Sequence, residues 1–367
     1  MRKLLCLLLA LALTPAFAGA STQEGLDGLL FAAGSDVLQP ALLQTTLSFA
    51  QTSSAEAAAE ALEAAGFTVV RQSGYDKAVD DDSHTCAYTI ARQELSVNGE
   101  RRVLLAVTVR GTSTPGEWMS NFDFAPSHSD DTAVAENFFF AAEAIYADLK
   151  AEIDAAENPL VLVTGYSRGA ACANLLGVLL NTAYDASNVY VYTFATPTTM
   201  RGARAEQEYP NIFNIVNPAD LATRLPLEAW GYRRPGTDIV LPAKSEDIQS
   251  TQALTATLAE LSPSISSYYE DLHSLTSPGT SEQGVTVFAC LQGLCASMMD
   301  ETAPQEAQAD MNQLAAMVQE DSDLAPLFRL ILHDGESWQA GMSSLLAQHM
   351  PAVYLALLEQ TDWDSYL

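Results

Sequence analysis

The sequence predicts an α/β protein in which a mostly parallel central sheet is flanked by helices. Runs rich in β-branched residues alternate with segments of helical periodicity, and this alternation is typical of parallel strands joined by crossover helices. The run at residues 160–163 is entirely apolar, as expected for a strand that is buried on both faces. A chain of 367 residues, 48% of them hydrophobic, can form one large core and also carry an insertion.

The N-terminus predicts a secretory signal peptide. Arg2 and Lys3 precede a short apolar run at residues 4–13, and an Ala-x-Ala site follows that ends at Ala18. We expect cleavage near Ala18 and secretion of the rest of the chain.

The composition is strongly acidic, with 17 Lys and Arg residues against 46 Asp and Glu residues. Residues 1–18 contain two basic residues and no acidic one, so their removal changes the net charge from −29 to −31. Such a chain repels nucleic-acid phosphates and anionic membrane surfaces. The charge therefore argues against a nucleic-acid partner and favours a soluble or neutral substrate.

Four cysteines remain after residue 18: Cys86, Cys172, Cys290 and Cys295. An even number permits disulfides in a secreted protein. Cys290 and Cys295 are close enough in sequence to close a small loop. Cys172 is expected to be a small buried hydrophobe on a helix.

The N-terminal part, residues 19–66, predicts helices that cover one face of the sheet. One helix is expected over residues 37–43. A second is expected over residues 55–65, with Ser54 as its N-cap and Gly66 as its stop signal.

A β-hairpin is expected next. Two β-rich runs at residues 86–97 and 102–109 flank Asn98-Gly99, the dipeptide that a two-residue hairpin turn prefers. An amphipathic helix at residues 132–153 then leads to the apolar strand.

Three further strands are expected at residues 188–194, 211–216 and 239–241. Beyond Pro242 the composition becomes rich in Ala, Ser, Glu and Gln, which predicts a helical insertion that we interpret as a lid or acyl-binding cap. The predicted organisation is a signal peptide (1–18), an α/β core (19–243), the helical insertion (244–340) and a C-terminal helix that completes the core (341–367).

The apolar strand ends in Gly-x-Ser-x-Gly, formed by Gly165, Ser167 and Gly169, and good helix formers follow at residues 170–180. Strand, turn and helix in this order are typical of a nucleophile elbow, which exposes the serine hydroxyl above the edge of the sheet. The glycines are needed because a Cβ atom at either position would meet a neighbouring strand or helix. The alternative is a serine that caps the helix in an ordinary turn.

A serine nucleophile needs a base, a carboxylate that orients the base, and donors for the oxyanion. In an open α/β sheet these groups gather at the carboxyl ends of the strands. Asp220 follows one predicted strand and Thr112 follows another. Asp185 and Asp238 are weaker candidates for the acid; Asp185 precedes a strand instead of following one.

The base must be chosen among five histidines: His84, His128, His273, His333 and His349. The first two precede the nucleophile and lie in polar loops, where a histidine is usually exposed. The last three follow Asp220, in the order nucleophile, acid, base that this architecture has. His349 opens a predicted helix with Pro351 in its first turn, where proline is preferred, so the backbone of His349 would be held in place.

These segments resemble the class 3 (fungal-lipase-like) α/β-hydrolase family over about residues 48–241 and the final helix, and the chain is identified as a bacterial member. Five motifs are similar. They are an Arg-Gly-Thr strand end followed by a tryptophan (109–112 with Trp118), the serine elbow (165–170), a Thr-Phe-x-x-Pro strand end (193–197), the segment with the acid (216–226) and a Tyr-x-x-x-Gly strand (232–236). The resemblance implies the α/β-hydrolase fold.

The resemblance also implies functions for single residues. The backbone N–H of Thr112, with its hydroxyl, and the backbone N–H of Arg168 would be the oxyanion donors. The base would lie in a His-x-x-x-x-Tyr-Leu segment, a spacing that His349 fits and His273 does not. The chain departs from the family at two positions. Tyr166 stands in place of a histidine before the serine, and Ala170 stands in place of the glycine that follows the position of Gly169. Neither departure removes a catalytic group.

The residues and the resemblance together predict a secreted serine ester hydrolase, a lipase or carboxylesterase, with Ser167, Asp220 and His349 as its triad. It would act on small ester or lipid substrates, with transient contact at a lipid interface.

No cofactor or metal is expected, because no His, Cys or Asp cluster has ligand spacing, and the polar loop at residues 80–84 lacks the glycine and closing glutamate of a calcium loop. Two alternatives remain, a non-catalytic surface-binding protein and a peptidase on the same fold. Acyl length, head group and oligomeric state stay open.

Overall fold

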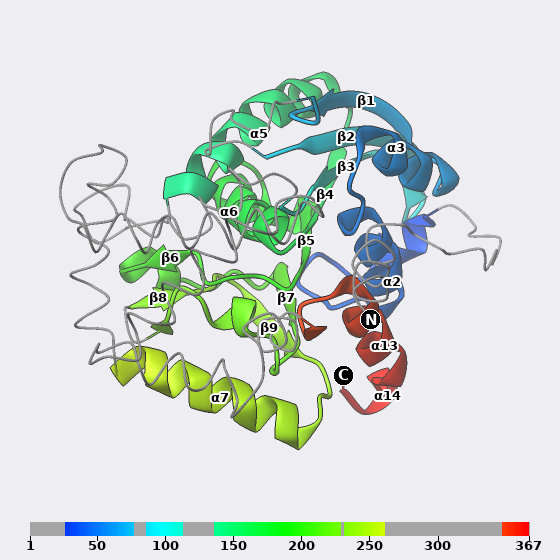
Figure 1. The fold of residues 1–367 in the computed structure, drawn as a ribbon. Coiled ribbons are helices and arrows are strands. Elements are labelled where there is room, and N and C mark those ends of the chain that lie inside the picture. Colours follow the sequence, from blue (N-terminus) through cyan, green and yellow to red (C-terminus); the bar gives the residue numbers. More distant parts are fainter. Residues whose placement is uncertain (1–25, 77–85, 113–135, 229–230, 261–346, 367) are drawn as a thin grey trace, which may run out of the picture.

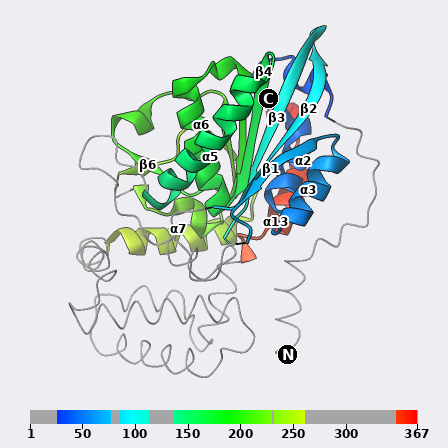
Figure 2. The same cartoon turned by 90° about the horizontal axis from the view of Figure 1, so that it is seen from above.

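The computed structural model describes residues 26–76, 86–112, 136–228, 231–260 and 347–366. They form a seven-stranded sheet with helices on both faces (Figures 1 and 2). Across the sheet the strands follow the order β1-β2-β3-β4-β5-β7-β9. Their bounds are, in that order, Thr68–Ser73, Tyr88–Val97, Glu100–Val109, Pro159–Tyr166, Val189–Phe194, Ile212–Val216 and Thr237–Val240.

The sheet is mostly parallel, as predicted. β3, β4, β5, β7 and β9 run parallel to one another. At one edge of the sheet β2 pairs antiparallel with β3, and β1 pairs antiparallel with β2. Every residue of the central strands β4 and β5 is buried, because helices cover both faces. The carboxyl ends of the parallel strands therefore meet at one edge, where a site can form.

The helices divide between the two faces (Figure 2). α5 (Glu136–Ala155) and α6 (Arg168–Ala183) contribute to one apolar core cluster. α2 (Pro40–Ala50), α3 (Ala55–Ala64) and α13 (Pro351–Gln360) contribute to the cluster on the opposite face. Further described elements are α7 (Ser245–Glu260), α14 (Trp363–Tyr366), a small ladder of β6 (Met200–Arg201) and β8 (Tyr232–Arg233), and the 3-10 helices η1 (Gly28–Phe31), η2 (Ala186–Asn188), η3 (Ala203–Glu206) and η4 (Leu221–Arg224).

The predicted hairpin forms between β2 and β3. Asn98 and Gly99 have φ values of 52° and 83°, and positive φ at both central residues is what a type I′ turn requires. Val97 pairs directly with Glu100 across the turn, so the two-residue turn sets the register of the whole pair.

The predicted start of α3 agrees with the structure, whereas the predicted start of α2 does not. The Ser54 hydroxyl accepts the N–H of Ala57 at 3.1 Å, as expected of the N-cap of α3. The preceding helix begins at Pro40, so the expected start at residue 37 is wrong by three residues. Proline suits the first helical position because a backbone N–H there would have no partner in the helix, so that its absence in proline costs no hydrogen bond. Within the described ranges, no helix is long and apolar enough to cross a membrane.

Several predicted features lie outside the described residues and stay predictions: the signal peptide, the loop at 80–84, Trp118, His84, His128, His273, His333, Cys290, Cys295 and residues 261–340 of the helical insertion. Tyr354 and Leu358 of α13 are buried in the same apolar cluster as the side chains of α2.

Candidate active site

Ser167 lies in the sharp turn between β4 and α6. Its backbone has φ 56° and ψ −122°, a conformation that a residue with a side chain rarely adopts and that costs about 1–3 kcal/mol. The Ser167 N–H donates to the Phe194 carbonyl at 3.0 Å, so β5 helps to hold the turn. This is the geometry of a nucleophile elbow, in which the serine sits between the end of a strand and the start of a helix.

The two glycines of the elbow allow the backbone segments to approach each other closely. A Cβ atom on Gly165 would lie 2.3 Å from the carbonyl oxygen of Gly169. A Cβ atom on Gly169 would lie 2.2 Å from the carbonyl oxygen of Val109, at the end of β3. Both contacts are with backbone atoms, so α6 would have to move away from the sheet to accommodate any other residue.

Ser167, His349 and Asp220 form a continuous chain of hydrogen bonds. The Ser167 hydroxyl lies 2.8 Å from Nε2 of His349, and Nδ1 of His349 lies 2.8 Å from Oδ2 of Asp220. Both distances are those of good hydrogen bonds. Ser167 follows β4 and Asp220 follows β7, so parallel strand ends bring these two together. His349 reaches them from the opposite end of the sequence, because α13 packs on the sheet face next to α2.

The two alternative acids have other contacts. Asp185 caps η2 before β5 and accepts the N–H of Ser187 at 3.0 Å. Asp238 lies in β9 and forms an ion pair with Arg234. Neither contact is with His349.

The Asp220 carboxylate is fully buried and has several donors. Besides His349, the Tyr354 hydroxyl donates to Oδ2 at 2.8 Å and the Ala222 N–H donates to Oδ1 at 2.9 Å. The Tyr354 hydroxyl in turn accepts the N–H of Asn217 at 3.2 Å. A buried carboxylate without such partners would be costly; here the donors stabilise it and hold it toward the imidazole.

The main chain at His349 is held at two adjacent carbonyls. The Tyr166 hydroxyl donates to the His349 carbonyl at 2.7 Å, and the side-chain amide of Asn217 donates to the Gln348 carbonyl at 3.0 Å. α13 begins after Met350, its N-cap. The prediction that His349 opens the helix is therefore wrong by two residues, because the fixed φ of proline starts the helix at its own position.

Sequence reasoning missed three residues that contact His349, Asp220 or a residue beside them. Tyr354 follows His349 by five residues, and Asn217 precedes Asp220 by three; these two spacings are the signals that could have indicated both. Tyr166 was noted only as a departure from the family that removes no catalytic group. Its partner carbonyl is 183 residues away in the chain, so no local pattern reveals the bond.

Burial and the charge of the Asp220 carboxylate shift the pKa values of His349, Tyr166 and Tyr354. Burial disfavours the protonated ring of His349, whereas the charge and hydrogen bond of the Asp220 carboxylate favour it, and together these raise the pKa of His349 above its usual value of 6.5. Burial raises the pKa of Tyr166 and Tyr354 well above 10, and the Asp220 charge acts in the same direction. Both phenols therefore keep their protons and act as hydrogen-bond donors.

Replacing Tyr166 by phenylalanine is expected to lower kcat about 10-fold with little change in KM, because the loss of one buried hydrogen bond loosens the His349 backbone. Steady-state kinetics on a p-nitrophenyl ester would measure this. The matched control is Tyr190→Phe, which removes a similar bond, 2.9 Å to the Phe31 carbonyl, away from the triad. Equal kcat values for the two variants would contradict a positioning effect of Tyr166.

The expected oxyanion donors flank the elbow. Arg168 is the first residue of α6, and the first N–H groups of a helix have no partner within it. The Arg168 side chain turns to α5, with its guanidinium 5.5 Å from the ring centre of Phe138. Thr112 follows β3 and is half-buried. Gly111 beside it lies close to the elbow, since a Cβ atom there would be 3.1 Å from the Tyr166 carbonyl oxygen.

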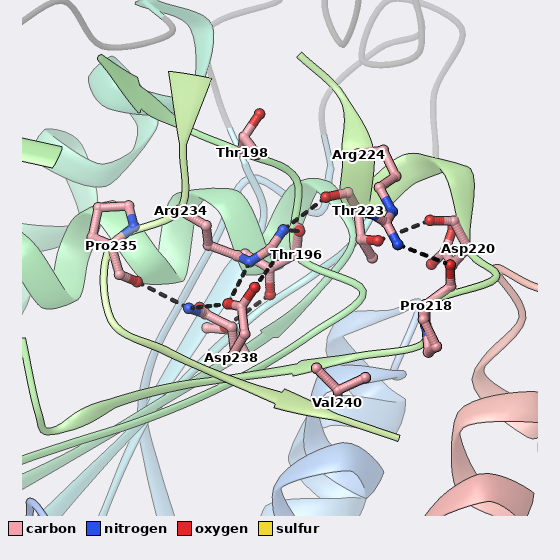
Figure 3. A network of polar contacts seen from close by, with 12 residues as sticks. Thr196, Thr198, Pro218, Asp220, Thr223, Arg224, Arg234, Pro235, Asp238 and Val240 are labelled. Carbon is pink, nitrogen blue, oxygen red and sulfur yellow. Dashed lines mark hydrogen bonds and ion pairs between the residues drawn. The ribbon is translucent and has the colours of Figure 1, made fainter. Parts of the chain in front are cut away.

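Arg234 ties the segment that carries Asp220 to two neighbouring segments (Figure 3). Its guanidinium donates to the Thr196 carbonyl at 2.6 Å, to the Thr223 carbonyl at 2.8 Å, and through Nε to Asp238 Oδ1 at 2.9 Å. Thr196 follows β5, Thr223 lies in η4 directly after the acid, and Asp238 lies in β9. One side chain thus connects the chain after β5, the chain after Asp220 and the start of β9.

Arg234→Met is expected to lower the free energy of unfolding by about 2–3 kcal/mol, because two carbonyls and a carboxylate lose a charged donor. Urea denaturation would measure the change. Arg224→Met is the control, since the hydrogen bond of Arg224 to the Pro218 carbonyl is longer, at 3.3 Å. This variant should lose under about 1 kcal/mol. A loss in Arg234→Met no larger than in the control would show that the connection is not a stabilising one.

Within the part of the chain that the structure describes, no group of three or more His, Cys, Asp or Glu side chains has the arrangement of a metal site. The described groups of the site include a hydroxyl, an imidazole, a buried carboxylate and backbone N–H groups. This is the set of groups that acyl transfer through a serine requires.

The sheet, its strand order and the elbow define the architecture as that of the α/β-hydrolases. Residues 106–230, which are 125 of the 367, match the family model described as Lipase (class 3). The match confirms, for this segment, the family that the motifs indicated. The chain thus carries a lipase-type ester hydrolase domain.

Solved structures of fungal lipases are similar to this chain. The triacylglyceride lipase of Rhizomucor miehei is 20% identical over 56% of this chain and 81% of that one, with a TM-score of 0.43. The mono- and diacylglycerol lipase from Aspergillus oryzae is 18% identical over 57% of this chain and 81% of that one, with a TM-score of 0.42. No curated protein matches the chain.

Proposed function

We propose that the protein hydrolyses carboxylic esters through an acyl-enzyme on Ser167, with His349 as the base and Asp220 as the residue that orients it. The observation that carries this proposal is the pair of 2.8 Å contacts that joins the Ser167 hydroxyl, the imidazole and the Asp220 carboxylate. The strained elbow supports it, because strain of this kind is kept where a side chain must be presented for chemistry.

The first half of the reaction forms the acyl-enzyme. Nε2 of neutral His349 accepts the Ser167 proton while Oγ bonds to the acyl carbon, and the Asp220 carboxylate stabilises the imidazolium that results. Negative charge develops on the carbonyl oxygen. We assign the backbone N–H groups of Thr112 and Arg168 as the hydrogen-bond donors that stabilise this charge. The imidazolium then returns the proton to the alcohol oxygen as its bond to the acyl carbon breaks.

The second half releases the acid. His349 takes a proton from water, whose oxygen attacks the acyl carbon of the ester on Ser167. The tetrahedral species collapses with return of that proton to Oγ, which regenerates the serine. Throughout, the buried Asp220 keeps Nδ1 protonated and Nε2 facing the nucleophile, so one tautomer serves both halves.

The dependence of kcat/KM on pH should report the base. Only neutral His349 can accept the Ser167 proton, and its pKa is raised, so activity is expected to fall as the pH drops through an apparent pKa above 6.5. In Asp220→Asn the charge that favours the imidazolium is lost. The acid limb should then move to lower pH, while the plateau falls by about 10⁴-fold.

Initial rates on p-nitrophenyl butyrate across the pH range would test this expectation. Asp185→Asn is the control, because its carboxylate caps η2 and does not touch the imidazole. An acid limb that stays in place in Asp220→Asn would mean that another group sets the pKa of the base.

The substrate class is tested with p-nitrophenyl esters of increasing acyl length, a triglyceride emulsion and a peptide p-nitroanilide. Ester turnover with little amide turnover supports the proposal. Amide turnover with inert esters would identify a peptidase, and the absence of any turnover together with failure to react with a fluorophosphonate would identify a binding protein. The acidic composition favours neutral acyl esters over anionic interfaces.

We also propose that the protein is secreted, on the strength of the basic start, the short apolar run and the Ala-x-Ala site in residues 1–18. Expression of the full chain in a bacterium, followed by N-terminal sequencing of the exported protein, would test this. A mature chain that begins after Ala18 is expected; an uncleaved chain in the cell would contradict it.

A further inference from the structure

Two buried cysteines that are far apart in the sequence lie in contact, one of them just before β2 and the other in α6, the helix that follows the elbow. Sγ of Cys86 and Sγ of Cys172 lie 3.1 Å apart, about 1 Å more than the length of a disulfide bond. The exposed fractions of the two residues are 6% and 0%, and both belong to the apolar cluster beneath α5 and α6. Within the described residues, no group of three or more His, Cys, Asp or Glu side chains that could hold a metal ion includes them.

We propose that Cys86 and Cys172 form a disulfide when the protein folds under oxidising conditions. The two thiols give up two protons and two electrons as the sulfur–sulfur bond forms. A disulfide oxidant, such as oxidised glutathione or a thiol–disulfide oxidoreductase, accepts them and is reduced to two thiols. Because both residues are buried in the native fold, the exchange takes place during folding, while the sulfurs are still accessible.

The bond would fasten together the two backbone segments to which we assign the oxyanion donors. Next to Cys86, the Ala87 carbonyl accepts the N–H of Arg110 at 2.9 Å, two residues before Thr112. Cys172 lies one helical turn after Arg168 in α6. The disulfide would thus link the strand pair that leads to one donor with the helix that begins at the other. The bond itself does not depend on the proposed reaction.

The cross-link also closes a long loop. The two cysteines are 86 residues apart, and a bond across such a separation removes much of the freedom of the unfolded chain. The oxidised protein is therefore expected to melt about 10 °C above the reduced one.

The bond is tested in the full chain with Cys6, Cys290 and Cys295 replaced by alanine, so that the proposed pair remains. The protein is refolded in a glutathione redox buffer, denatured in iodoacetamide and weighed by mass spectrometry. We expect no label before reduction and two labels after it, with a peptide that contains Cys86 linked to one that contains Cys172. Two labels without reduction would overturn the proposal. In the unaltered chain, a link from either residue to Cys290 or Cys295 would overturn it as well.

Stability provides a second test that does not need the cysteine-depleted chain. Cys86→Ala and Cys172→Ala should each lower the melting temperature of the oxidised protein, and the double variant should be little worse than either one. Residues that share one bond lose it with the first substitution, whereas independent packing losses add. Additive losses, with no effect of reductant on the unaltered protein, would show that the two side chains only pack.

Discussion

Ser167→Ala is expected to lower kcat on p-nitrophenyl esters by about 10⁶-fold, because it removes the hydroxyl that lies 2.8 Å from Nε2 of His349. The residual rate would come from the oxyanion donors and from binding alone. Labelling by a fluorophosphonate probe should disappear in the same variant. Initial rates on protein quantified by absorbance, together with labelling on a gel, would measure both effects.

Ser187→Ala is the matched control for this experiment. Ser187 is exposed, and its hydroxyl donates to Asp185 at 2.9 Å, before β5. The control should keep both its rate and its labelling. Full activity of Ser167→Ala would exclude the acyl-enzyme on this residue, and labelling at another serine would show where the nucleophile lies.

His349→Ala is expected to lower kcat by about 10⁴-fold or more, because the Ser167 hydroxyl loses the group that takes its proton. The Asp220 carboxylate loses one of its buried donors at the same time. Circular dichroism must therefore show that the variant is folded before the rates are compared. The rate loss should exceed that of Tyr166→Phe by orders of magnitude, since one variant removes the base and the other only loosens its backbone.

His273→Ala is the control with the most information, because the sequence left His273 as an alternative base. It should keep the rate of the unaltered enzyme within about two-fold. If His273→Ala were inactive and His349→Ala active, the base would be His273, and the contact between His349 and Ser167 would not be the catalytic one.

The sequence predicted the fold well wherever a local signal determines the backbone. Asn98-Gly99 has the residue types that a type I′ turn needs, so hairpin and register follow from two residues. The apolar run of β4 indicated a strand with both faces covered. The start of α2 was misplaced because apolar periodicity at residues 37–38 outweighed the proline at position 40, whose ring sets the first helical residue.

The candidate site divides in the same way. Gly165, Ser167 and Gly169 stand within one turn of the chain, so their pattern indicated the elbow directly. Asp220 could be expected because it follows a strand of a parallel sheet. The base could not be chosen by periodicity or spacing along the strand pattern, since three histidines follow the acid in the required order; only the resemblance favoured His349.

By itself the sequence determined what depends on neighbours in the chain: the strands and helices, the tight serine turn and the acid placed at a strand end. Only the tertiary structure decided which imidazole reaches the hydroxyl, that the Tyr166 and Tyr354 phenols contact the His349 carbonyl and the Asp220 carboxylate, and that Cys86 lies against Cys172. These contacts join residues 182, 183, 134 and 86 positions apart. Contacts across such separations form only when helices pack on both faces of the sheet, so they depend on the whole core and leave no local pattern in the chain.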